Sequence, residues 1–237
     1  MGPALAALVA SYLAVTGITL ACGLLLTKVL TDHGVGQFDA HVASWLAERR
    51  TEVLNEITKW ATNLANTEPV VAVAAVAALI LAVRRQWREL VFLLSALLIE
   101  ITVFLSVNLL VARPRPNVIR LNDAPITSSY PSGHAAASLV LWGAIGVIVT
   151  MLSTNLVPRV LAWIPLAIMS WLVPFARLYR GMHFFTDVIC GLVLGLLALG
   201  GGVLVARTWV AGCARRRGPA MQGPAEDEPL ESLAALR

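Results

Sequence analysis

The sequence predicts an all-α polytopic membrane protein with six transmembrane helices. Hydrophobic residues make up 58% of the 237-residue chain and charged residues only 14%, whereas soluble domains average about 45–50% apolar and about 25% charged residues. Six apolar segments also approach the roughly 20 residues that a helix needs to cross the hydrocarbon core of a bilayer. The apolar excess therefore predicts side chains that face lipid.

The predicted spans differ in length, and the second is the shortest. The first has no basic residues before its apolar run, and this run is too long for a signal peptide alone, so we interpret it as a retained helix. Glycines in the last span are expected to allow close helix packing. The six spans are predicted at 4–29, 68–84, 89–112, 134–153, 157–176 and 184–207.

The polar stretch between the first two spans, 31–67, carries apolar residues at roughly helical spacing, among them Phe38, Val42, Trp45 and Trp60. Two interpretations fit this pattern equally. Short helices could lie in the membrane interface, or a solvated helical hairpin could pack against the bundle. With this segment included, the membrane domain is predicted to cover residues 1–207.

The last residues, 208–237, are rich in glycine, proline and mixed charge, which predicts a flexible tail. Six spans place both termini on one side of the membrane. Arginines in the loops after spans two and four and at the start of the tail favour the cytoplasm for that side. The predicted location is the cell membrane, inner or plasma, with the opposite loops on the extracytoplasmic face.

Three polar clusters occur at span boundaries, and the alternation of spans places all three on the extracytoplasmic side. They are R-P-R-P at 113–116, P-S-G-H at 131–134 and R-L-Y-R-G-M-H-F-F-T-D at 177–187. Arg115 and Arg177 offer the rigid forks of donors that suit phosphate oxygens. Ser132 and Gly133 precede a helix whose free N–H groups can also bind an anion. Together they predict a cradle for a phosphate group.

The two histidines in these clusters suggest the chemistry. His183 and Asp187 are four residues apart and would share one face of a helix, so the carboxylate could fix the tautomer of the ring and leave its other nitrogen as a nucleophile. His134 could then protonate the leaving alkoxide. We expect a phosphohistidine intermediate without a metal or cofactor, because arginines and amides would neutralise the developing charge.

These motifs resemble those of the type-2 phosphatidic acid phosphatase superfamily, which also includes the vanadium haloperoxidases. The three motifs of that superfamily are K-x6-R-P, P-S-G-H and S-R-x5-H-x3-D. The second motif is complete, the third has Ala176 in place of serine, and the first has Asn108 in place of lysine. The resemblance implies six spans and a lipid phosphatase. It also implies His183 as nucleophile, Asp187 as its partner and His134 as acid, with Arg115, Ser132, Gly133 and Arg177 as phosphate ligands.

The substitution at Asn108 removes one cation from the expected phosphate site. Losing one such contact could cost about 2–4 kcal/mol in the transition state. Arg113, Arg120 and Arg180 are candidates to replace it. A further polar residue, Glu100, lies in the middle of the third span, where we expect either a structural hydrogen bond or a contact to the substrate.

The expected substrates are phosphatidic acid, phosphatidylglycerophosphate, or a polyprenyl phosphate or diphosphate in the bilayer. Two alternatives remain open: transfer of the phosphate to another lipid, and a non-catalytic lipid-binding or transport protein on the same scaffold. The mild net charge of +4 is spread over segment ends, which argues against a nucleic-acid partner.

Overall fold

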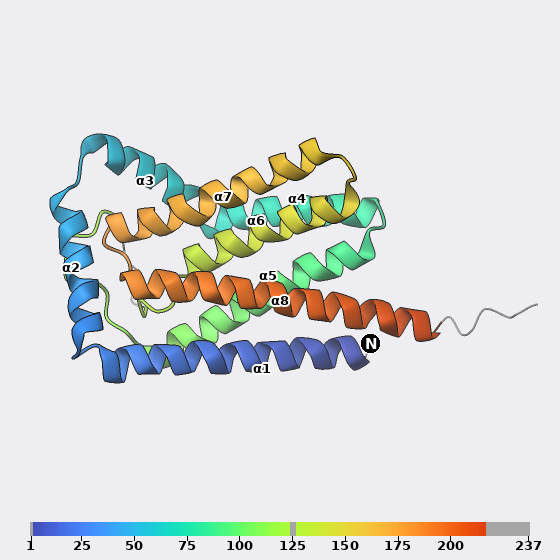
Figure 1. Cartoon of the computed structure of the whole chain (residues 1–237), viewed down its shortest axis with the longest axis horizontal. Coiled ribbons are helices and arrows are strands. Elements are labelled where there is room, and N and C mark those ends of the chain that lie inside the picture. Colours follow the sequence, from blue (N-terminus) through green and yellow to red (C-terminus); the bar gives the residue numbers. More distant parts are fainter. Residues whose placement is uncertain (1, 124–126, 217–237) are drawn as a thin grey trace, which may run out of the picture.

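The computed structural model describes residues 2–123 and 127–216, and this part of the chain is predominantly helical (Figure 1). A π-helical turn, Leu26–Leu30, extends the first helix. In chain order the α-helices are α1 (Gly2–Leu25), α2 (Gly34–Glu48), α3 (Glu52–Leu64), α4 (Thr67–Val83), α5 (Trp87–Val111), α6 (Gly133–Leu152), α7 (Leu156–Tyr179) and α8 (Phe185–Arg216).

Five helices are long and apolar enough to cross a membrane on their own: α1 with its π-helical turn, α5, α6, α7 and α8. The 17-residue α4 is too short by itself. It follows α3 after a short break with a bend of 47°, and the pair qualifies as one broken span. The predicted all-α membrane fold is confirmed, and the six spans are reached when α3 and α4 count as one.

The last helix is longer than predicted. We expected the span to end at 207 and a flexible tail to begin at 208, but α8 continues to Arg216. Trp209 and Val210 extend its apolar pattern, and the first proline after the span is Pro219, so nothing in the sequence stops the helix earlier. The rest of the predicted tail, 217–237, lies outside the described residues.

The centre of the bundle is formed by α5 and α8, with α1 and α6 packed against them (Figure 1). Glycines allow the close approach. A Cβ atom on Gly201 or Gly202 would lie 2.8 Å from Ile99 or Ala96 on α5. The expected packing role of glycine is thus confirmed at these two positions. It is wrong at Gly200, where a Cβ would meet nothing within 4 Å.

The segment between the first two spans forms α2 and α3. α2 lies across one end of the bundle, whereas the N-terminal end of α1 and the end of α8 lie at the opposite end (Figure 1). α3 packs against α7 and still exposes an apolar stripe of Val53, Ile57, Trp60 and Leu64. An exposed stripe of this kind favours contact with the membrane over a fully solvated hairpin.

Candidate active site

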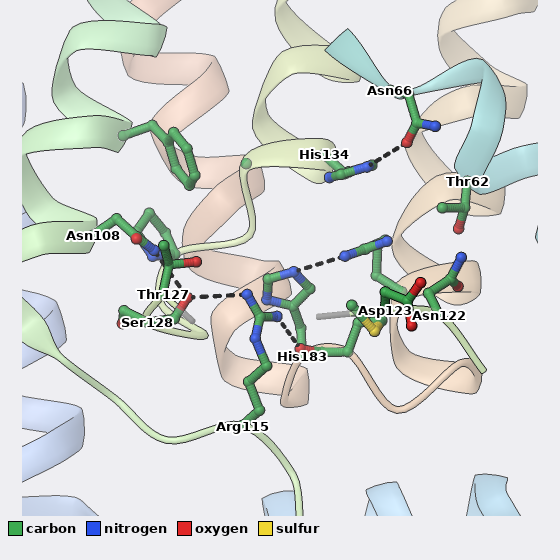
Figure 2. Close-up of a pocket in the computed structure, with 15 residues that line it drawn as sticks. Thr62, Asn66, Asn108, Arg115, Asn122, Asp123, Thr127, Ser128, His134 and His183 are labelled. Carbon is green, nitrogen blue, oxygen red and sulfur yellow. Dashed lines mark hydrogen bonds between the residues drawn. The ribbon is translucent and has the colours of Figure 1, made fainter. Parts of the chain in front are cut away.

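The three polar clusters come together around one cavity of about 350 Å³ (Figure 2). Its walls are formed by α5, the loop between α5 and α6, the start of α6, the end of α7, the loop between α7 and α8, and the break between α3 and α4. Lining side chains include Asn66, Phe104, Asn108, Arg115, Asp123, Gly133, His134, Arg177 and His183. The expectation that the motifs meet on one side of the bundle is therefore met.

The predicted phosphate ligands carry hydrogen-bonding capacity that the protein does not use. Arg115 donates from Nη1 to the Met182 carbonyl at 2.6 Å, but its Nε is buried without a partner among the described residues. The same holds for Nε of the buried Arg177 and for Oγ of Ser132. Buried donors are normally paired, so the unused Nε groups of two arginines that line the cavity, with Ser132 next to the lining residues Pro131 and Gly133, are consistent with a polar ligand.

Gly133 is the first residue of α6, and Ser132 is its N-cap. The Ser132 side chain forms no capping hydrogen bond, which leaves the first N–H groups of the helix available to an anion. A Cβ on Gly133 would lie 2.8 Å from the Phe104 ring. The packing of Phe104 therefore requires glycine at this position. The absence of a side chain would also let a ligand approach the backbone closely.

His183 is buried, and its hydrogen bonds define the state of the ring. Nδ1 lies 2.6 Å from the carbonyl oxygen of Ser129. A carbonyl only accepts, so Nδ1 carries the proton. Burial, followed by the charges of Arg177 and Arg115, lowers the pKa of His183 well below its usual value. The ring is neutral, and its bare Nε2 lies 3.5 Å from Nη2 of Arg177.

Asp187 does not orient His183 in the way that we predicted. His183 lies before α8, which begins at Phe185, so the argument from a shared helix face does not apply. The Asp187 carboxylate instead accepts from the backbone N–H of Phe184 at 2.9 Å, as in a capping box. Its backbone carbonyl accepts from Ser132 N at 3.0 Å. Asp187 thus holds the turn that carries His183, while Ser129 fixes the ring.

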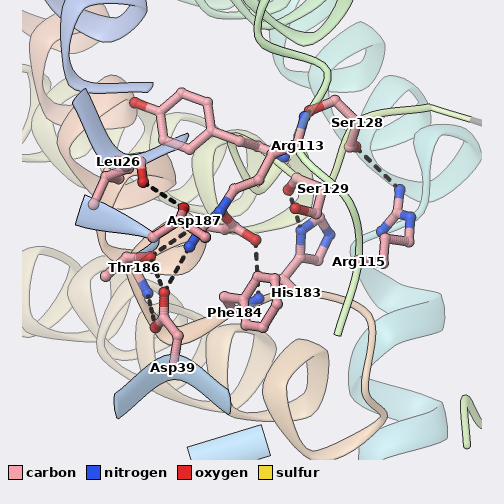
Figure 3. Close-up of polar contacts among 12 residues, drawn as sticks. Leu26, Asp39, Arg113, Arg115, Ser128, Ser129, His183, Phe184, Thr186 and Asp187 are labelled. Carbon is pink, nitrogen blue, oxygen red and sulfur yellow. Dashed lines mark hydrogen bonds and ion pairs between the residues drawn. The ribbon is translucent and has the colours of Figure 1, made fainter. Parts of the chain in front are cut away.

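Arg113 is the centre of a buried ion-pair network (Figure 3). Its Nη1 donates to Asp187 Oδ1 at 2.5 Å and its Nη2 to Asp39 Oδ2 at 2.8 Å. Burial disfavours the charge, but the carboxylates of Asp187 and Asp39 outweigh it and raise the pKa of Arg113. Both carboxylates are fully buried. Arg113 therefore stabilises the turn and is not free to bind phosphate.

Sequence reasoning missed Asp39, which lies on α2. The same carboxylate accepts from the backbone N–H and the hydroxyl of Thr186 and so ties α2 to the first turn of α8. A signal for it exists in the sequence. Asp39 shares the buried face of α2 with Ala43 and Leu46, and a lone acid on an apolar helix face requires a partner.

His134 is held by a second residue that sequence reasoning missed. Its Nε2 lies 3.1 Å from Oδ1 of Asn66, and Figure 2 shows the two side chains pointing toward each other. Asn66 is the N-cap of α4 but forms no side-chain cap. The amide is therefore used for His134 at the break between α3 and α4. No motif marks this residue, because the break is visible only in three dimensions.

Comparison with known proteins agrees with this geometry. Residues 88–211, a little over half of the chain, match the family model described as the PAP2 superfamily. The chain belongs to the PAP2 superfamily. The resemblance inferred from the motifs is thus confirmed, together with the enzyme class that it implies, a phosphoric ester hydrolase of membrane lipids. No curated protein matches the chain by sequence.

Two solved structures share the PAP2 fold with this chain. The first is the transmembrane PAP2-type phosphatidylglycerolphosphate phosphatase from Bacillus subtilis, with a TM-score of 0.63 and 18% identity over 90% of this chain and 99% of that chain. The second is LpxE from Aquifex aeolicus, with a TM-score of 0.51 and 20% identity over 70% of this chain and 93% of that chain. At these identities the likeness concerns the fold.

Asn108, which occupies the position of the lysine in the PAP2 motif, has a different task here. Its Nδ2 donates to the carbonyls of Ser128 at 2.9 Å and Tyr130 at 3.1 Å. These bonds hold the loop whose Ser129 carbonyl fixes His183. The residue therefore shapes the site through the backbone and brings no charge to it.

None of the arginines considered as replacements for this lysine lines the cavity in the described part of the chain. Arg113 is engaged by its two carboxylates. Arg180 donates to Asn122, to the Leu121 carbonyl and to α3, so its donors are used by the fold. Arg120 is exposed. The hydrogen bonds of Arg113 and Arg180 argue against a phosphate-binding role for these two residues, and the role suggested for Arg120 stays a prediction.

We expect the Asn108→Leu variant to lose about 1–3 kcal/mol of stability, because the Tyr130 carbonyl loses its donor and the Ser128 carbonyl keeps only the 3.3 Å bond from Arg115 Nη2. Its phosphatase activity should fall with it, since the loop behind His183 loosens. Asn63→Leu makes the same change at an exposed position of α3 and should leave both quantities unchanged. Thermal unfolding and phosphate release from purified protein measure the two effects. Equal losses in the two variants would contradict the assigned roles.

Glu100 is buried in the middle of α5. It forms no hydrogen bond within the described residues, and the cavity that holds His183 is not lined by it. Neither of the two roles expected for it is therefore supported.

Proposed function

We propose that this PAP2 protein hydrolyses a phosphomonoester of a membrane lipid through a phosphohistidine intermediate on His183. The observation that supports the proposal most strongly is the state of His183: a neutral ring whose bare Nε2 faces the guanidinium of Arg177. A nucleophile needs an available lone pair beside a group that binds the electrophile. Nε2 meets both conditions, because its lone pair accepts only one long hydrogen bond, 3.5 Å from Arg177, which a phosphate bound between the two groups would replace.

In the proposed first step, Nε2 of His183 attacks phosphorus, a P–N bond forms and the bond from phosphorus to the lipid oxygen breaks. Arg115, Arg177 and the N–H groups at the start of α6 stabilise the charge on the phosphoryl oxygens. Nε2 of His134 donates its hydrogen bond to Asn66 Oδ1. The proton for the leaving oxygen therefore comes from Nδ1, which requires that the His134 ring is charged when the substrate is bound.

In the second step, water attacks phosphorus while His134 accepts its proton. The P–N bond breaks, phosphate leaves and His183 returns to its neutral state. His134 then holds the proton that it took from water, and it is charged in the next cycle when a substrate dianion is bound. No step needs a further group to receive or supply protons. Asp187 contributes by holding the turn at 183–187 and the amide of Ser132.

The charges around the cavity favour a monophosphate over a diphosphate. Two guanidiniums, those of Arg115 and Arg177, match the two negative charges of a phosphomonoester. Asn108 provides no third cation, and the exposed carboxylate of Asp123 lies in the cavity wall, where it would repel additional phosphate charge. Phosphatidic acid, phosphatidylglycerophosphate and polyprenyl phosphate all fit this requirement.

We place the active site on the extracytoplasmic face and both termini in the cytoplasm. The end of the bundle opposite the cavity carries the arginine-rich connections. Arg84, Arg85 and Arg88 lie around the start of α5, and Arg215 and Arg216 lie at the end of α8. The positive-inside rule favours the cytoplasm for such an end.

Phosphate release from a panel of purified lipid phosphates tests the function. We expect release from monophosphates, with polyprenyl diphosphate hydrolysed more slowly. A phosphorylated acceptor lipid in place of inorganic phosphate would identify a transferase. Binding of lipid phosphates with no turnover of any of them would identify the non-catalytic alternative.

The Asn66→Ala variant should lower kcat by about tenfold to a hundredfold with little change in KM, because the ring of His134 loses the partner that orients it. Asn66→Asp keeps an acceptor oxygen and should retain more activity. Asn63→Ala, an exposed residue of α3, serves as the control. An Asn66→Ala enzyme with an unchanged kcat would show that His134 does not depend on this contact.

A further inference from the structure

A second cleft, with apolar walls and three charged residues in its lining, lies at the end of the bundle opposite the candidate active site. It has a volume of about 200 Å³, and its apolar walls come from α5, α6 and α8. Three charged residues line it: Arg88, Glu89 and Arg207. The exposed Trp87 lies next to them, as expected where a helix leaves the membrane.

Glu89 is the buried member of this group, with only 7% of its surface exposed. Its position, three residues after the N-cap Gln86 of α5, is that of a capping-box glutamate. The Gln86 N–H, however, donates to the Leu81 carbonyl at 2.8 Å. The carboxylate is therefore not used by its own helix, and no ion pair or hydrogen bond to it exists within residues 2–123 and 127–216.

Arg88 and Arg207 also line the cleft, but both are exposed. The cleft thus presents one buried negative group with two positive groups near its opening. A carboxylate in such a place is stable when a cation reaches it. The two arginines remain available for an anion that is part of the same molecule.

We propose that this cleft binds a phospholipid whose headgroup carries a primary ammonium beside its phosphate. The ammonium donates hydrogen bonds to Glu89, the phosphate accepts from Arg88 and Arg207, and the acyl chains follow the apolar walls formed by residues such as Phe92 and Val203. A headgroup with phosphate alone would leave Glu89 unpaired. A choline headgroup has no N–H to donate.

Binding of short-chain phosphatidylethanolamine, phosphatidylcholine and phosphatidylglycerol to the purified full-length protein in detergent tests the proposal, with native mass spectrometry as readout. The wild type should retain one phosphatidylethanolamine more tightly than the other two lipids. Glu89→Gln should weaken this binding by about tenfold or more. The control Glu68→Gln changes an exposed acid in the first turn of α4 and should have no effect.

Arg207→Gln provides a second variant that leaves the buried part of the cleft intact, and it should weaken binding of the same lipid. Phosphatase activity should be unchanged in Glu89→Gln, because the cleft lies at the other end of the bundle. Equal retention of the three lipids by the wild type would overturn the proposal. Equal retention of phosphatidylethanolamine by wild type and both variants would overturn it as well.

Discussion

Replacing His183 with glutamine is expected to lower phosphate release by about a thousandfold or more, because the variant loses the nitrogen that attacks phosphorus. Glutamine keeps a polar side chain of similar reach, so the turn at 183–187 and its contacts with Arg113 and Ser132 should persist. Steady-state kinetics with the best substrate of the lipid panel measure the loss, and thermal unfolding verifies that the variant is folded.

The matched control for this variant is His41→Gln. His41 is an exposed histidine of α2, and its replacement should leave the rate unchanged. A His183→Gln enzyme that is folded and releases phosphate at more than about a tenth of the wild-type rate would contradict covalent catalysis by this residue.

The Arg113→Leu variant is expected to be the least stable of the single variants proposed for this protein, by about 3–5 kcal/mol, because it leaves the buried carboxylates of Asp39 and Asp187 without their shared cation. The resulting loss of the turn at 183–187 should also remove activity. Thermal unfolding in detergent measures the first effect and phosphate release the second.

A double variant distinguishes two causes of the expected loss of stability, the unpaired carboxylates and the lost packing of the Arg113 side chain. Adding Asp39→Asn to Arg113→Leu removes one of the two unpaired charges and should recover part of the stability. Arg120→Leu removes an exposed arginine and serves as the control for loss of a guanidinium. If Arg113→Leu were as stable as the control, the network would not hold α2 and α8 together.

The predicted site residues that the structure brings together around one cavity are those carried by motifs with fixed spacing. Arg115, Gly133, His134, Arg177 and His183 all line the cavity, because each motif lies at a span boundary and the alternation of spans fixes its side. The fold followed from the same apolar segments. Only the second predicted span could not be assigned fully from the sequence, because the short α4 qualifies as a span only together with α3.

The contacts between motifs could not be predicted from spacing. The pairing of Asp187 with His183 assumed that both lie on one helix, but α8 begins after His183, and the carboxylate is drawn to Arg113 instead. Asn66 reaches His134 only because α3 and α4 meet at a bend. The role of Asn108 could be recognised only once its carbonyl partners were known. These contacts depend on the exact residues at which helices begin and end. Hydrophobic periodicity predicts helix ends only to within a few residues, so it could not predict the contacts.

The most direct test of the account is to stop the reaction during turnover and locate the phosphoryl group. With a radiolabelled lipid monophosphate and rapid quenching, we expect a phosphoenzyme that is labile in acid, stable in base and mapped to His183, as a phosphohistidine should be. The label should be absent from His183→Gln. Turnover that proceeds without any phosphoenzyme, or a label on another residue, would contradict His183 as the nucleophile.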